Sequence, residues 1–78
     1  MNLIYSSNYV SARTFALAQE LMPGDWKWIK DGRVVLECPR ADVYKIRQWQ
    51  ANPQHDDIDA ALERARTSRR LGSLVDFS

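Results

Sequence analysis

The predicted fold depends on one stretch of the chain, which reads Asp25-Trp26-Lys27-Trp28-Ile29-Lys30-Asp31-Gly32-Arg33-Val34-Val35-Leu36-Glu37-Cys38. Two runs rich in aromatic and β-branched residues, which favour strands, flank the dipeptide Asp31-Gly32. An Asp-Gly pair between two such runs favours the two-residue turn of a β-hairpin. Both turn positions need a positive φ, which glycine adopts freely and aspartate tolerates. We therefore predict a hairpin over residues 25–38.

A two-residue turn also fixes which side chains share a face, because side chains alternate along each strand. The face predicted to join the core carries Ile29, Val34, Leu36, Cys38 and the stem of Lys27. The opposite face carries Trp26, Trp28, Lys30, Arg33, Val35 and Glu37. Two tryptophans thus lie beside two cations on this second face, and either a helix or a partner must cover it.

The chain has 78 residues, of which 45% are hydrophobic and 27% are charged. This composition is typical of one small globular domain rather than of a disordered tail. The formal net charge of +1 selects no class of partner. The basic residues are unevenly distributed, however, and one cluster holds Arg64, Arg66, Arg69 and Arg70. Arginine binds phosphates and carboxylates through paired hydrogen bonds that lysine cannot match.

The lone cysteine, Cys38, excludes an internal disulfide and any zinc site built from several cysteines. No apolar run approaches the roughly 20 residues that a membrane helix needs. The N-terminus also lacks the basic region of a signal peptide. We therefore expect a cytosolic protein that does not bind membranes.

The N-terminal part of the chain is predicted to form a strand and a helix. Residues 2–6 are mostly apolar and suit a short strand. Ser7 or Asn8 can cap the helix that follows, which should run from about Tyr9 to Leu21, because a short side-chain oxygen accepts a hydrogen bond from a free backbone N–H. The turn before this helix has no glycine and no P-loop lysine, which disfavours a phosphate-binding loop.

In the C-terminal half, residues 43–49 suit either a strand or a helix, and we predict a strand because β-branched and aromatic residues dominate. Residues 56–71 are the clearest helix, with Gly72 as its C-cap. Its apolar face carries Ile58, Ala61, Leu62 and Ala65. Residues 73–78 are predicted to be a C-terminal tail that docks on the domain or on a partner. The predicted fold is α+β and close to α/β, a single domain over residues 1–72 with a small mixed sheet of about four strands and two helices in the order β-α-β-β-β-α.

Candidate catalytic and metal-binding residues are few. His55 is the only histidine and has no second ligand at a suitable spacing, so we expect it at a helix start. The cluster of Asp56, Asp57 and Asp59 fits the first turn of a helix, where carboxylates complement the helix dipole, and a divalent-metal site is the open alternative. No nucleophile and base can be recognised. We predict that the protein is not an enzyme and uses no cofactor, metal or small-molecule substrate.

Two kinds of macromolecular partner remain. Cations alternate with aromatic residues in 26–30 and 45–49, as in the stacking platforms of nucleic-acid-binding proteins. Tryptophan and arginine are also the residues most enriched at protein interfaces, and an edge strand can pair with an extended peptide. Because the net charge is near zero, protein binding is the preferred prediction and a single-stranded nucleic-acid-binding module is the alternative. The predicted partner-binding residues are Trp26, Trp28, Lys30, Arg33, Val35, Arg47, Arg66, Arg69 and Arg70.

The chain also resembles a family of small phage proteins. The resemblance spans most of the chain and rests on a short strand followed by Ser-Ser-Asn-Tyr-x-Ser-Ala-x-x-Phe-Ala, over residues 6–16, and on Leu21-Met22-Pro23-Gly24-Asp25-Trp26-Lys27-Trp28-Ile29. The small size and the preference for arginine suit a phage of a GC-rich host. Within this family, the chain is most similar to the RNA-polymerase-binding transcription regulators of lytic Xanthomonas phages.

This resemblance implies a function and a location. The protein would bind the β′ subunit of bacterial RNA polymerase near the RNA exit channel, in the cytoplasm of the infected host. There it would inhibit initiation by displacing σ and would act as an antiterminator during elongation, in contact with elongation factors at the channel. No single residue role can be carried over from the family.

Overall fold

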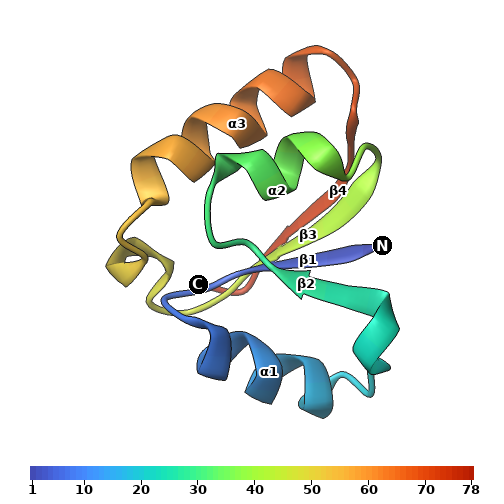
Figure 1. Cartoon of the computed structure of the whole chain (residues 1–78), viewed down its shortest axis with the longest axis vertical. Coiled ribbons are helices and arrows are strands. Elements are labelled where there is room, and N and C mark those ends of the chain that lie inside the picture. The colour runs from blue at the N-terminus through green and yellow to red at the C-terminus, as the bar shows by residue number, and fades with distance from the viewer.

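The computed structural model describes all 78 residues as a sheet between two layers of helices (Figure 1). In chain order the elements are β1 (Asn2–Tyr5), α1 (Tyr9–Ala18), β2 (Trp26–Trp28), α2 (Gly32–Glu37), β3 (Ala41–Lys45), α3 (His55–Thr67) and β4 (Leu71–Asp76). Short 3₁₀ turns at Pro23–Asp25 and Trp49–Ala51 precede β2 and α3. None of the helices combines the length and the apolar character that a membrane crossing needs.

The four strands form one sheet in the order β2-β1-β3-β4. All three pairings are parallel: Asn2 in β1 lies opposite both Trp26 in β2 and Asp42 in β3, and Val43 in β3 lies opposite Leu74 in β4. Helix α1 lies on one face of the sheet, and α2 and α3 lie together on the other (Figure 1). The prediction of a small α+β domain with about four strands is confirmed, and its two helices fit roughly. A third, short helix, α2, stands where a second hairpin strand was predicted, so the order is β-α-β-α-β-α-β rather than β-α-β-β-β-α. The sheet, however, is wholly parallel rather than mixed.

The predicted hairpin over residues 25–38 is wrong. Asp31 has an extended backbone and caps α2, because its Oδ1 accepts a hydrogen bond from the Arg33 N–H at 3.0 Å. Gly32 begins the helix and has no positive φ. Glycine is required there because α3 is close, since a Cβ on Gly32 would lie 2.8 Å from the backbone oxygen of Asp57 and 3.0 Å from the Ala61 Cβ. The Asp-Gly pair is thus a helix cap followed by a close helix contact.

Both predicted helices are present, and each ends a few residues earlier than predicted. Asn8 is the N-cap of α1, and its Oδ1 accepts from the Ser11 N–H at 2.9 Å. This helix ends at Ala18 rather than Leu21, and α3 ends at Thr67, with Ser68 rather than Gly72 as its C-cap. The strand predicted over 43–49 is β3, which begins and ends earlier, at Ala41–Lys45.

The residues predicted as a C-terminal tail do dock on the domain, which was one of the two expected outcomes. They do so as part of β4 (Leu71–Asp76), however, so this segment belongs to the sheet and the domain does not end at residue 72. Gly72 lies in this strand against the start of β3, where a Cβ would lie 2.8 Å from the backbone oxygens of both Arg40 and Ala41. The Asp42 carboxylate then accepts hydrogen bonds from the Ser73 N–H and hydroxyl, each at 3.0 Å. These contacts fix β4 at the edge of the sheet.

The core has one part on each face of the sheet. The larger part lies under α2 and α3 and includes the predicted apolar face of α3, which is Ile58, Ala61, Leu62 and Ala65. The smaller part lies under α1 and is centred on Ile4, Ala12, Ala16 and Ile46. Cys38 is half-buried beside the larger part and forms no disulfide.

A fully buried asparagine, Asn52, joins the carboxyl ends of β1 and β2 to the start of α3. The Asn52 amide donates to the backbone oxygens of Ser6 at 3.0 Å and Ile29 at 3.1 Å. Its carbonyl oxygen accepts from the Gln54 N–H at 2.9 Å. All three contacts are with backbone groups, so this side chain positions the loops after β1 and β2 relative to the start of α3.

Candidate protein-binding surfaces

The structure does not bring the nine predicted partner-binding residues together on one surface. Trp26, Trp28 and Lys30 line a shallow cavity beside the edge strand β2. Arg47 lies at the carboxyl end of the sheet, on the rim of a different cavity. The others lie on or around α2 and α3: Arg33, Val35, Arg66, Arg69 and Arg70. The predicted surface depended on a hairpin, and without the hairpin its members separate.

Val35 was predicted to bind a partner, and this prediction is wrong because the side chain is buried in the core and only 3% exposed. Residues 32–37 form a helix, so their side chains follow a period of 3.6 residues instead of alternating. The same change moves Leu36, predicted as core, to the surface, where it is 46% exposed. Ile29 is buried as predicted, and Val34 and Cys38 pack at the edge of the core.

The two tryptophans of β2 are half-buried against α1, so a helix covers part of the face on which they lie. The Trp26 ring stacks on Tyr9 with 5.7 Å between ring centroids. The Trp28 indole N–H donates to the Ser6 backbone oxygen at 3.4 Å. Lys27 and Lys30 are exposed beside them along a cavity of about 310 Å³. Aromatic rings and cations are therefore neighbours here, as predicted, but the rings also serve the core.

A second surface lies on the same face of the sheet, and its apolar residues are not among the nine predicted partner-binding residues. Helix α1 packs on β1 and β2 and leaves the half formed by β3 and β4 without a helix (Figure 1). Three rings gather there: Phe15 from α1, Tyr44 from β3 and Phe77 after β4, with centroid distances of 5.5 to 6.3 Å. Phe77 is 49% exposed and the neighbouring Val75 is 37% exposed. We call Phe15, Tyr44, Val75 and Phe77 the aromatic surface.

A cavity of about 480 Å³ adjoins the aromatic surface at the carboxyl end of the sheet. Its walls are Ser11, Phe15, Gln19, Ile46, Arg47, Gln48 and Phe77. Arg47 is exposed and forms no ion pair, so its guanidinium is free to bind a partner's acid. The apolar content of residues 74–77 was the sequence signal for this surface, since those residues are too apolar for a free end.

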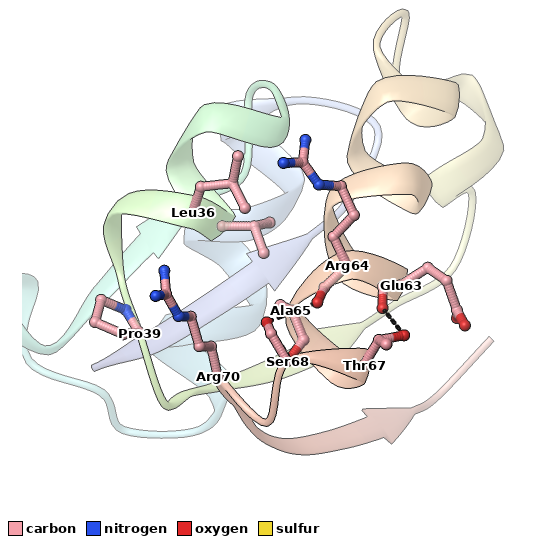
Figure 2. A pocket seen from close by; sticks show the side chains of 9 residues that line it. Leu36, Pro39, Glu63, Arg64, Ala65, Thr67, Ser68 and Arg70 are labelled. Atoms are coloured by element: carbon pink, nitrogen blue, oxygen red, sulfur yellow. Dashed lines mark hydrogen bonds between the residues drawn. The ribbon is translucent and has the colours of Figure 1, made fainter.

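A third surface is a pocket of about 450 Å³ between α2 and the C-terminal half of α3 (Figure 2). Leu36 and Pro39 line one side, and Arg64 and Arg70 extend over it from α3 and from the residues that follow it. Of the arginines predicted to bind a partner, only Arg70 lines this pocket, and Arg64 was not one of them. The other five lining residues are Val35, Glu63, Ala65, Thr67 and Ser68.

The remaining predicted arginines have other positions. Arg66 forms an ion pair with Glu63, in which the guanidinium nitrogens lie 2.5 and 3.2 Å from the carboxylate oxygens. This pairing lowers the pKa of the Glu63 carboxyl below its ordinary value and raises that of Arg66. Arg69 is exposed with a φ of 59°, in the turn between α3 and β4.

The groups with shifted pKa values are each explained by contacts within the chain. Burial and a hydrogen bond to Asp59 at 2.8 Å raise the pKa of Tyr5. Hydrogen bonds from Ser73 lower the pKa of Asp42, and those from Ser78 lower that of Asp76. The acidic residues at the start of α3 belong to no group of His, Cys, Asp and Glu side chains that could hold a metal ion.

Comparison of this chain with protein-family models, with curated proteins and with solved structures finds no match. Its function is therefore inferred from its own surfaces and from the sequence features described above.

Proposed function

We propose that this chain acts by binding another protein rather than by catalysis, and that its partner is bacterial RNA polymerase. The single observation that carries protein binding is the aromatic surface on the half of the sheet that α1 leaves open. The identity of the partner rests on the sequence resemblance to phage regulators of the polymerase.

The aromatic surface has the properties of an interface. Contiguous exposed apolar side chains on a small monomer typically mark a site of interaction. Phe15, Tyr44 and Phe77 are held by each other, so they lose little side-chain entropy on binding. Arg47 on the rim adds a free cation next to an apolar centre, which is the arrangement that binding hot spots favour.

In the proposed mechanism the chain binds the β′ subunit near the RNA exit channel in the cytoplasm of an infected bacterium. Binding there displaces σ and inhibits initiation, and the same contact, shared with elongation factors, acts against termination. Both effects require only occupancy of a surface, which a domain of 78 residues is able to provide without an active site.

A second candidate function is binding of single-stranded nucleic acid, and the cavity beside β2 favours it. Tyr9, Trp26 and Trp28 line this cavity together with Lys27 and Lys30. Stacking rings next to cations are the usual elements of such sites. Steep loss of affinity with rising salt distinguishes this function from apolar protein binding, because phosphate contacts release counterions.

The test is capture of polymerase by the tagged protein from nuclease-treated bacterial lysate, followed by titration of the purified polymerase. We expect stoichiometric β and β′ with depleted σ. Phe77→Ala should weaken this binding by about 10-fold or more, whereas Leu17→Ala should have no effect, because Leu17 is 62% exposed on α1 outside the aromatic surface. Circular dichroism of both variants verifies folding.

Two outcomes would overturn the proposal. Absence of polymerase with retention of the protein on single-stranded oligonucleotides would promote the second candidate. Equal binding by Phe77→Ala and the unaltered chain would show that the aromatic surface is not the interface.

A further inference from the structure

The pocket between α2 and α3 combines an apolar floor with two cations that have no partner in the chain. Its floor is formed by Val35, Leu36 and Ala65, of which Leu36 is 46% exposed. Arg64 and Arg70 extend along it (Figure 2). Neither guanidinium makes a hydrogen bond or an ion pair within the chain, whereas Arg66 is paired with Glu63.

Capping of α3 does not explain the two free guanidiniums. The Arg64 backbone oxygen accepts from the Ser68 N–H at 3.0 Å and from the Ser68 hydroxyl at 2.8 Å. The Ala65 oxygen accepts from the Arg70 N–H at 2.8 Å, and the Arg66 oxygen accepts from the Arg69 N–H at 3.2 Å. The backbone oxygens of Arg64, Ala65 and Arg66 are thus satisfied by backbone groups and a serine, and neither guanidinium of Arg64 and Arg70 takes part in these bonds.

We propose that this pocket binds an acidic segment of a partner protein, one that presents an apolar side chain between two carboxylates. The apolar floor would accept the apolar side chain. The two guanidiniums would each bind a carboxylate through paired charge-assisted hydrogen bonds. A volume of about 450 Å³ is enough for a few residues of such a segment.

The lining of the pocket favours a protein segment over a nucleic acid. No aromatic side chain is among its nine lining residues, so a base would have no ring on which to stack. The Glu63 carboxylate also lines the pocket and is paired with Arg66, so the unpaired charge there is that of Arg64 and Arg70.

This inference does not rest on the proposed function, because the two surfaces lie on opposite faces of the sheet. The aromatic surface lies on the face of α1, and the arginine pocket lies between the helices of the other face (Figure 1). A chain with both surfaces is able to bind two separate segments at once.

The test uses the full chain labelled with ¹⁵N and a capped synthetic peptide that contains the tripeptide Asp-Leu-Glu between glycine and serine residues. Titration should shift the backbone amide signals of Leu36, Arg64 and Ser68, which line the pocket. The matching peptide with Asn-Leu-Gln, which lacks the two carboxylates, should bind at least 10-fold more weakly. The peptide with Asp-Ala-Glu, which lacks the leucine side chain, should also bind at least 10-fold more weakly. Binding should also weaken with salt, as for any partly exposed ion pair.

Two double variants distinguish binding of the peptide at the pocket from a general effect of the positive charge of the chain. Arg64→Gln with Arg70→Gln should weaken binding of the acidic peptide at least 10-fold. Arg13→Gln with Arg69→Gln removes the same charge at exposed positions outside the pocket and should leave binding nearly unchanged. Phe77→Ala should also leave it unchanged, so failure of one surface can be distinguished from failure of the other.

Three results would overturn the inference. They are equal binding of the Asp-Leu-Glu and Asn-Leu-Gln peptides, equal effects of the two double variants, and shifts at the pocket produced by an oligothymidine in place of the acidic peptide. All four arginines are exposed, so the spectra of the double variants should retain the dispersion of a folded chain and each result can be interpreted.

Discussion

The Asp57 carboxylate accepts a hydrogen bond from the Gly32 backbone N–H at 2.8 Å. Asp57 lies in the first turn of α3, and Gly32 is the first residue of α2. The bond satisfies one of the free N–H groups at the start of α2, while the absence of a side chain on Gly32 lets the two helices touch. These two residues therefore fix how the helices pack on one face of the sheet.

Replacing Gly32 by alanine should destabilise the fold. The added Cβ would lie 2.8 Å from the Asp57 backbone oxygen, and a backbone atom cannot move aside as the end of a flexible side chain does. We expect a loss of about 1–3 kcal/mol in the free energy of unfolding, measured in urea. Gly24→Ala is the matched control, because a Cβ there meets nothing within 4 Å. A neutral Gly32→Ala would mean that the helices are farther apart than described.

Replacing Asn52 by alanine should cost about 2–4 kcal/mol of stability. The variant leaves the Ser6 and Ile29 backbone oxygens without their buried donor and creates a cavity in place of a fully buried side chain. Thermal and urea unfolding measure the loss. Gln50→Ala, at an exposed position two residues earlier, should be nearly neutral. A loss of stability below about 0.5 kcal/mol in Asn52→Ala would contradict the buried hydrogen bonds from Asn52 to the Ser6 and Ile29 backbone oxygens.

Trp28→Ala should destabilise the chain rather than act only on partner binding. The ring packs between β2 and α1, and its N–H bonds to Ser6, so truncation should cost about 2–4 kcal/mol. Lys27→Ala on the same strand is exposed and should change stability little. If Trp28→Ala retains full stability but loses partner binding, the tryptophan belongs to an interface and not to the core.

Tyr5 should make stability depend on pH in the alkaline range. Its pKa is raised above the ordinary 10.0 by burial and by the hydrogen bond to Asp59. Above pH 10 the unfolded chain therefore releases this proton more readily than the folded chain, so the contribution of Tyr5 is complete below pH 10 and declines as the pH rises further. Tyr5→Phe should flatten the loss of stability above pH 10, while Tyr9→Phe, at an exposed ring, should not. Equal alkaline slopes in Tyr5→Phe and the unaltered chain would refute this assignment.

The features predictable from the sequence are those that depend on neighbouring residues. The Asn8 cap and the apolar face of α3 follow local rules, and both are present. Asp31-Gly32 satisfies two local rules equally well, since the pair suits a hairpin turn and also a helix N-cap followed by a small residue. The contact with Asp57 decides between them, and that contact is 25 residues away in the chain.

The surfaces were less predictable than the fold, because they depend even more on contacts between residues that are far apart in the chain. The predicted set depended on the alternation of side chains in a hairpin, so the change from strand to helix buried Val35 and exposed Leu36. The aromatic surface needs Phe15, Tyr44 and Phe77 from three distant elements, and only the sheet order brings them together. Arg64 and Arg70 both belong to the arginine cluster seen in the sequence, but only the structure shows that these two line the pocket and that Arg66 is paired with Glu63 instead.

The parallel sheet also determines how this chain must fold. Residue Asn2 pairs with Trp26 and with Asp42, and Ala41 pairs with Leu71, so no two strands are joined by a short turn. Each pairing must close a long loop before its contacts can stabilise it, which slows folding relative to a hairpin protein of equal length. Of the four strands, the central strand β1 is synthesised before the others but cannot acquire its second neighbour until β3 has been synthesised, and the edge strand β4 is added after these three.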